Sequence, residues 1–224
     1  MKAEDLLLAS ELNADKAHEL LRAYGFKDTA AADRNLQLIA DEPQSRHILA
    51  RMINDVLETA RLAPDPDAAI NYFERLTANV AHRSNFLRFL SETHEALEAL
   101  LLICGTSPFN AEILIRNPEY FYWLLDELGF PSTKSREHYL QEASQAISKF
   151  DQDKHQLLAL ARLKRRELLR IGARDLLKVS RVSFTMQELS NLADAVIQCV
   201  YEVCLRGLVV RHGAPKQQDA SGTS

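Results

Sequence analysis

Five cations recur at every fourth position in one stretch of the sequence. They are Arg162, Arg166, Arg170, Arg174 and Lys178. In a helix, at about 100° per residue, such a set forms one stripe that drifts by roughly 40° per step. Leucines of the same stretch fall mainly on the opposite side. The stripe could hold an anion, such as nucleotide phosphates or an RNA backbone, or it could pair with acidic residues of a neighbouring helix.

Acidic partners are available on the next predicted helix, over 184–211. If this helix returns antiparallel across a turn near Arg181, Arg174 comes level with Glu188 and Arg170 lies within a turn of Asp194. Partly buried pairs of this kind fix the register of two helices more than they add net stability. We therefore prefer a structural or interface role for the following candidates: Arg166, Arg170, Arg174, Glu188 and Asp194.

Nucleotidyl transfer requires carboxylates that hold Mg²⁺ against a triphosphate. Two Asp-x-Asp pairs have suitable spacing, Asp65–Asp67 and Asp151–Asp153. The first lies in a proline-broken loop and the second at a helix start, and neither follows a Gly-Ser turn or a strand. We interpret both as helix caps. The sequence predicts no catalytic residue, cofactor-binding residue or metal ligand in this chain.

Other motifs also favour structural roles. His94 opens HEALE, which lacks the second histidine of a zinc-protease HExxH helix. The aromatic run 120–123 has no basic residue nearby, which favours a hydrophobic anchor over a stacking platform for bases. Cys104, Cys199 and Cys204 lie in apolar helical settings and are expected to be buried free thiols in a reducing cytosol.

The composition and the periodicity predict an all-α fold. Seven glycines and seven prolines in 224 residues leave few breaks for short strands. Apolar residues recur at helical spacing over 13–24, 29–41, 44–62, 67–80, 83–104 (one helix or a pair), 135–150, 153–178 and 184–211. Between 104 and 135, Ser107-Pro108 and Asn117-Pro118 each open a short helix. We expect a multi-helix array of about nine or ten helices, ending in a long antiparallel helical hairpin.

The clearest break, at 129–133, predicts two subdomains. Residues 1–130 would form an N-terminal helical subdomain, 131–212 the hairpin subdomain and 213–224 a disordered tail. The longest apolar run, 99–104, is far shorter than the roughly 20 residues that span a bilayer, and the first ten residues do not form a signal peptide. The net charge of −4 gives no overall bias toward nucleic acid or an anionic membrane. We expect a cytoplasmic protein that does not bind membranes, and nucleic acid is a disfavoured partner.

Four segments, in this order, carry a resemblance to a known family. They are DPDAAINYFERL, CGTSPFNAEILIRNPEYFYWLL, LARLKRRELLRIGARDLL and TMQELSNLADAVI, the last followed by RHGAP. Together they resemble the helical region that precedes the nucleotidyltransferase domain in glutamine synthetase adenylyltransferases (glutamate–ammonia-ligase adenylyltransferases). The resemblance covers about 65–215, and 163–194 is its most specific part.

The resemblance implies AMP transfer from ATP to a tyrosine of glutamine synthetase, which regulates nitrogen assimilation, with ATP and Mg²⁺ used by the whole enzyme. The family's catalytic stretch begins with a GKLGG-like turn and an S-D-x-D pair, which are not found here. The chain stops at Ser224, about where that stretch would begin, and it is expected to be inactive alone.

The expected role is therefore the helical N-terminal portion of such an enzyme, with glutamine synthetase and the missing nucleotidyltransferase domain as partners. The alternative is a free-standing helical interaction protein that binds a protein partner or a polyanion through the Arg162–Lys178 stripe. The sequence does not decide between a truncated chain and a natural short one.

Overall fold

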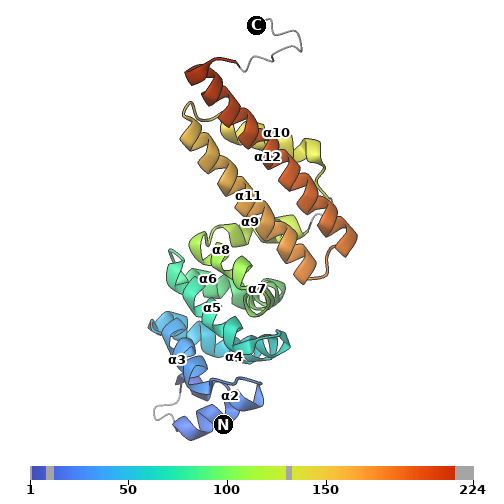
Figure 1. The fold of residues 1–224 in the computed structure, drawn as a ribbon. Helices are drawn as coiled ribbons and strands as arrows, with labels where there is room; N and C mark the ends of the chain where they lie inside the picture. The colour runs from blue at the N-terminus through green and yellow to red at the C-terminus, as the bar shows by residue number, and fades with distance from the viewer. Residues whose placement is uncertain (1, 9–12, 130–132, 215–224) are drawn as a thin grey trace, which may run out of the picture. The chain divides into compact units, whose positions relative to one another are not determined.

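The computed structural model describes residues 2–8, 13–129 and 133–214, and within them the chain is helical and has no strand (Figure 1). The all-α prediction is confirmed. The helices of the described residues are α1 (Asp5–Leu8), α2 (Ala14–Ala23), α3 (Thr29–Ile39), α4 (Pro43–Leu62), α5 (Pro66–Asn79), α6 (Arg83–Glu92), α7 (His94–Thr106), α8 (Pro108–Arg116), α9 (Tyr120–Leu128), α10 (Arg136–Ile147), α11 (Asp153–Leu176) and α12 (Val182–His212).

Several helices begin where short polar side chains predict an N-cap. The Asn13 side chain accepts from the Lys16 backbone N–H at 3.1 Å. Ser107 and Ser135 cap α8 and α10 in the same way, each accepting at 3.3 Å. Gly25, with φ of 88°, follows α2 in the left-handed conformation that glycine permits. These local signals place the helix boundaries within a few residues of the predicted ones.

The segment 83–104, predicted as one helix or a pair, forms a pair: α6 and α7 meet at Thr93. Two other boundaries differ from the prediction. The cap of α5 is Asp65, because Pro66 occupies the first helical turn. Asn117 does not cap α9: its side-chain amide donates to the Ile113 carbonyl at the end of α8, and α9 starts only at Tyr120. With the four-residue α1, the described residues hold twelve helices instead of nine or ten.

The structure divides into two compact units. The first contains Met1–Pro131 and Gly172–Ser180, and the second contains Ser132–Ile171 and Arg181–Ser224. Residues 215–224 of the predicted disordered tail lie outside the described part of the chain. Helix α11 contributes to both units, because its last residues, from Gly172, pack within the first.

In the first unit, α5 packs on α3, α7 and α8, while α4 packs on α6 and α7. Its core includes Leu49, Ile53 and Phe73, which are fully buried. Gly105, near the end of α7, marks the tightest approach. A Cβ added to it would lie 2.5 Å from the Cβ of Ala63 and 2.9 Å from the carbonyl oxygen of Asp65. The absence of a side chain at Gly105 therefore allows α7 to pack closely on the α4–α5 connection.

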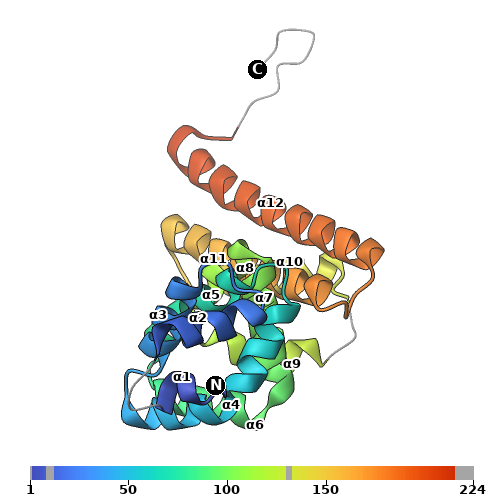
Figure 2. The same ribbon diagram turned by 90° about the horizontal axis from the view of Figure 1, so that it is seen from below.

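The second unit joins α10, α11 and α12 around two apolar clusters. One contains Tyr139, Ile171, Leu192 and Ala195, and the other contains Ala143, Leu160, Leu163 and Cys199. Each cluster takes residues from all three helices, so α10 belongs to this core as much as the predicted hairpin helices do. Figure 2 shows α12 as one unbroken helix. The long antiparallel hairpin as a separate element stays a prediction.

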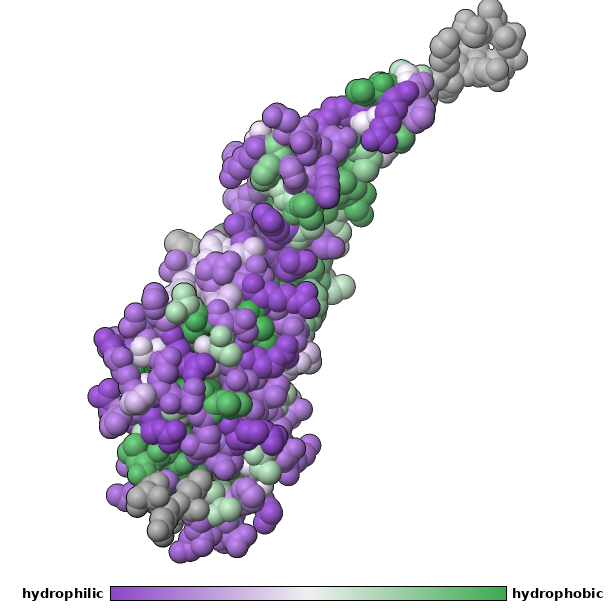
Figure 3. All heavy atoms as spheres, turned by 90° about the vertical axis from the view of Figure 1, so that its left-hand side faces the viewer, coloured by the Kyte–Doolittle hydropathy of each residue, from purple (hydrophilic) through white to green (hydrophobic). Residues whose placement is uncertain are grey.

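None of the helices among the described residues is long and apolar enough to cross a membrane. In the face drawn in Figure 3, polar and charged residues predominate, with smaller groups of hydrophobic residues among them. Near the end of α12, Leu208 and Val210 are 54% and 82% exposed.

Candidate functional site

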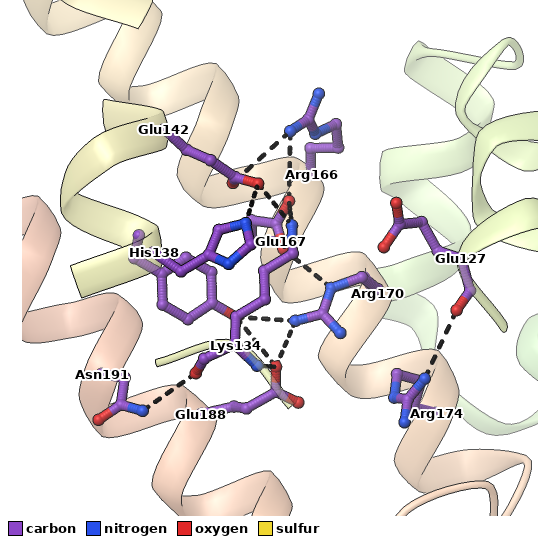
Figure 4. Close-up of polar contacts among 11 residues, drawn as sticks. Glu127, Lys134, His138, Glu142, Arg166, Glu167, Arg170, Arg174, Glu188 and Asn191 are labelled. Atoms are coloured by element: carbon purple, nitrogen blue, oxygen red, sulfur yellow. Dashed lines mark hydrogen bonds and ion pairs between the residues drawn. The ribbon is translucent and has the colours of Figure 1, made fainter. Parts of the chain in front are cut away.

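The most concentrated group of interacting charges lies inside the second unit, where α11 meets α12 (Figure 4). The guanidinium of Arg170 donates to Glu167 at 2.9 Å, to the Tyr139 hydroxyl at 2.7 Å and to Glu188. Each of these four side chains is at most 1% exposed. Ionised groups are almost never fully buried unless they are paired, and here each buried charge has a partner of opposite sign.

Lys134, which precedes α10, connects this group to a third part of the chain. Its ammonium contacts both oxygens of Glu167 at 3.1 Å, and its backbone N–H donates to Glu188 at 2.8 Å. Asn191 of α12 donates to the Lys134 carbonyl at 3.1 Å. The segment before α10 is thus fixed to α11 through a side chain and to α12 through its backbone.

An outer layer of charges is partly open to solvent. Glu142 of α10 accepts from the Lys134 ammonium at 2.9 Å. Arg166 lies 3.3 Å from Glu167 and 4.0 Å from Glu142, and the His138 ring lies 3.6 Å from Glu142. We call the buried and outer residues together the charge network: Lys134, His138, Tyr139, Glu142, Arg166, Glu167, Arg170 and Glu188.

The pKa values follow from this environment. Burial alone raises the pKa of the Glu167 carboxyl, but Lys134 and Arg170 outweigh it, and the net pKa lies below its ordinary value. Burial raises the pKa of the Tyr139 phenol, with the carboxylates of Glu188 and Glu167 adding to the shift against the opposing charge of Arg170. Tyr139 therefore stays neutral and can donate to Glu188.

The pKa of Arg170 is also shifted. Burial lowers it, while Tyr139, Glu188 and Glu167 raise it by more, so the net pKa lies above its ordinary value. Arg170 is therefore a permanent buried cation. Removing one partner from such a pair leaves an uncompensated charge and costs about 3–5 kcal/mol. The network can hold three segments in one register, but it offers no free acid or base for chemistry.

The residues of the predicted stripe have separate environments. Arg162 is exposed, Arg166 is about one-third exposed in the outer layer, and Arg170 is buried in the network. Arg174 is buried in the first unit, where it donates to the Glu127 carbonyl at 3.5 Å. Lys178 is exposed, with φ of 57° in the turn after α11. The five cations do not form one continuous surface.

The register between α11 and α12 differs from the expected one by a helical turn. Glu188 pairs with Arg170, where the sequence predicted Arg174. The reason is that residues 172–180 pack within the first unit, so the first ion pair of the second unit forms one turn earlier on α11. Asp194 is exposed, and no ion pair joins it to another residue of the described ranges. The network therefore unites Arg166, Arg170 and Glu188, but neither Arg174 nor Asp194.

Tyr139 and Glu167 of the buried group, and Lys134 beside it, were not among the predicted candidates. Lys134 lies in the segment interpreted as a break, and Tyr139 and Glu167 lie in amphipathic helices without a distinctive motif. The available signal for Glu167 was its position on the apolar side of α11, between Leu163 and Ile171. A carboxylate there predicts a buried partner. No comparable signal marks Lys134, because its role depends on a contact with a residue 54 positions away.

The described residues do not fit a triphosphate-bound Mg²⁺. They contain no group of three acidic, histidine or cysteine side chains placed to hold a metal ion. The Asp65 carboxylate caps α5 at Ala68, and Asp67 accepts from the backbone N–H groups of Lys27 and Asp28. Asp153 pairs with Arg206 at 3.4 Å. These acids therefore have structural partners, and no transfer step is assigned to them.

The cysteines agree with the prediction only in part. All three are free thiols, and Cys104 and Cys199 are buried, but Cys204 is exposed. The difference arises because α12 buries only one side, along Leu192, Cys199 and Val203, and Cys204 falls on another.

Fold and site together define an all-α module held in register by buried ion pairs, with no metal-binding cluster among its described residues. The comparison with protein families identifies it further. The family described as Glutamate-ammonia ligase adenylyltransferase matches residues 97–224, and the chain belongs to that family.

A curated relative is the bifunctional glutamine synthetase adenylyltransferase/adenylyl-removing enzyme of Thioalkalivibrio sulfidiphilus (strain HL-EbGR7). It is 24% identical over 217 residues, which are 93% of this chain and 22% of the relative. The chain thus spans about a fifth of the length of that relative. The family match, which begins at residue 97, covers most of α7 and all of α8 to α12, including the charge network.

Proposed function

We propose that this chain is a helical portion of a glutamine synthetase adenylyltransferase that braces the nucleotidyltransferase domain and does not itself transfer AMP. In this proposal the nucleotidyltransferase domain binds ATP and Mg²⁺, and glutamine synthetase is the protein that receives the AMP. Family membership supports the enzyme system. The structural partners of the acidic pairs support a role without chemistry.

The observation that carries the bracing role is an exposed apolar face on α12. It contains Val182, Met186, Leu189, Ile197, Tyr201 and Leu208, which are 37–71% exposed. At about 100° per residue, these six positions fall within an arc of roughly 120°. We call this set the α12 apolar stripe. It lies away from the buried side of α12, which carries Glu188, Leu192, Ala195 and Cys199.

A further domain of the same enzyme is the binding partner that best fits the α12 apolar stripe. Contiguous exposed apolar surface on a soluble protein marks an interaction site. Two copies of a 31-residue helix, each about 46 Å long and about 10 Å wide, would bury roughly 900 Å² in total, which is small for a stable dimer. The same area is sufficient when the partner is tethered, because effective concentrations reach the millimolar range. A domain of the same enzyme meets that condition.

Co-expression tests the proposal. The chain is produced with the rest of the Thioalkalivibrio relative, from which the matching segment has been deleted, and co-purification and AMP transfer to glutamine synthetase are measured with ATP and Mg²⁺. We expect the chain alone to transfer nothing and to restore transfer by the deleted enzyme. Ile197→Lys on the stripe should abolish this restoration, while Leu158→Lys, on an exposed leucine of α11, should not.

Label transfer by the pure chain would contradict the non-catalytic role. Equal restoration by Ile197→Lys and Leu158→Lys would contradict the stripe as the contact surface. The alternative of polyanion binding has less support, since Arg170 and Arg174 are 1% and 2% exposed and cannot contact phosphates. It would gain support if heparin bound the chain and Arg162→Ala with Arg165→Ala removed that binding.

A further inference from the structure

A cleft of about 710 Å³ opens within the first unit. Its walls come from the end of α4, one face of α7, the end of α9 and the turn after α11. The lining is mainly apolar and includes Leu62, Leu102, Leu125 and Leu128, together with Glu95 and Glu98. The α12 apolar stripe contributes nothing to this lining, so the cleft is a separate surface.

The cleft is elongated along α7. The α7 positions in the lining run from Glu95 to Thr106 with spacings of one, three and four residues, which places them on one face of the helix. Eleven residues at 1.5 Å each give a length of about 16 Å, or three helical turns. Leu125 and Leu128 of α9 add a second apolar wall with helical spacing. Such a groove between two helices fits the apolar face of a third helix.

The charges of the lining indicate the sign of the ligand. Glu95 and Glu98 are exposed and lie three residues apart on α7. No ion pair joins either carboxylate to another residue of the described ranges. The lining holds two carboxylates and one ammonium, that of Lys178. Its charge is therefore net negative, and the two carboxylates are available to a cation.

We propose that this cleft binds an amphipathic helix of a partner protein. The helix inserts apolar side chains at positions i, i+3, i+4 and i+7 between α7 and α9, and places lysine or arginine side chains beside Glu95 and Glu98. The apolar walls supply the affinity and the two carboxylates fix the direction of the bound helix. This inference does not depend on the proposed function, because it concerns a different unit and a different surface.

Peptide titration with the whole chain tests the proposal. The probe is a fluorescein-labelled Leu/Ala/Lys peptide of about 12 residues with leucines at i, i+3, i+4 and i+7 and lysines beside them, and its anisotropy gives the Kd. Glu95→Lys with Glu98→Lys should weaken binding by about tenfold. The same double variant should bind a peptide with glutamates in place of the lysines more tightly than the unaltered chain does. The charge-matched control, Glu19→Lys with Glu202→Lys, changes exposed residues outside the cleft.

Leu62→Lys tests the apolar wall, because Leu62 is 64% exposed and its replacement should leave the fold intact. We expect it to reduce binding by at least tenfold, while Ile197→Lys on the α12 apolar stripe leaves the Kd unchanged. Circular dichroism melting confirms that each variant is folded. The proposal is overturned if no binding occurs up to about 1 mM peptide, if charge reversal on the chain and on the peptide do not compensate, or if Ile197→Lys removes binding and Leu62→Lys does not.

Discussion

Arg170 of α11 and Glu188 of α12 form a direct hydrogen-bonded ion pair in which both side chains are 1% exposed. The pair is completed by Tyr139, which contacts both partners, and by the Lys134 backbone N–H, which donates to Glu188. Three helices and the segment before α10 meet at these two side chains. Their replacement should therefore affect the whole second unit.

Arg170→Met should lower the free energy of unfolding by about 3–5 kcal/mol, because Glu188 and Glu167 would lose a buried counter-charge. Urea denaturation followed by circular dichroism measures the change. Arg165→Met is the matched control, since Arg165 lies on the same helix but is exposed, and it should alter stability by at most about 0.5 kcal/mol. Similar losses for the two variants would show that the buried Arg170–Glu188 pair contributes no more to stability than an exposed arginine does.

Stability should fall in acid through Glu167. Its folded-state pKa lies below its ordinary value of 4.5, so the unfolded chain takes up the proton first as the pH falls. The contribution of Glu167 is fully present above about pH 5 and is lost as the pH falls through its folded-state pKa. Melting temperatures between pH 3 and 7 measure this slope.

Glu167→Gln should destabilise the protein at neutral pH and flatten the acid slope relative to the unaltered chain. Glu202→Gln, an exposed change on α12, serves as the control and should leave the slope as it is. An unchanged slope in Glu167→Gln would assign the acid sensitivity to other carboxylates.

Gly105→Ala should destabilise the first unit by about 2 kcal/mol or more, because the added methyl meets the Cβ of Ala63 at 2.5 Å and a backbone oxygen at 2.9 Å. Gly129→Ala is the control: the nearest atom to its added Cβ is the Asp126 carbonyl oxygen at 3.4 Å. Thermal melts of both variants give the comparison. Equal melting temperatures would mean that the α4–α5 connection moves away from α7 without cost.

The thiols should react selectively. Cys204 is exposed, whereas burial raises the pKa of the Cys104 thiol to about 12 and also raises that of Cys199. Iodoacetamide at pH 8 should therefore modify Cys204 in the folded chain and all three cysteines in urea, because the thiolate is the reactive form. Peptide mass spectrometry after labelling identifies the sites. Rapid labelling of Cys104 without denaturant would contradict its burial.

Local signals in the sequence predict the fold well. Asn13, Ser107 and Ser135 form hydrogen bonds that fix helix starts within a few residues, so capping chemistry alone locates these boundaries. The boundary between α6 and α7 was harder to predict, since no proline or glycine marks their junction at Thr93. The all-α class follows from the helical spacing of apolar residues, which is a local property of the sequence.

The charge network was only partly predictable. The spacing of Arg166 and Arg170 and the acidic Glu188 indicated an ion-paired contact between two helices. Which arginine pairs with Glu188 depends on where α11 stops contributing to the second unit, at Ile171. No local sequence pattern marks that position. The contributions of Lys134 and Tyr139 arise from the packing of α10, which periodicity identifies as a helix without showing what it packs against.

The buried charge network also constrains how this sequence can diverge. Apolar core residues such as Leu160 or Ile171 can be exchanged for others of similar volume at small cost. A change of Arg170 alone leaves the buried Glu188 without a cation, and a change of Lys134, Glu167 or Glu188 alone removes one of the ion pairs of a buried charge. In distant relatives these four positions should therefore be kept together or be replaced together by apolar residues, while most of the surrounding helical surface varies freely.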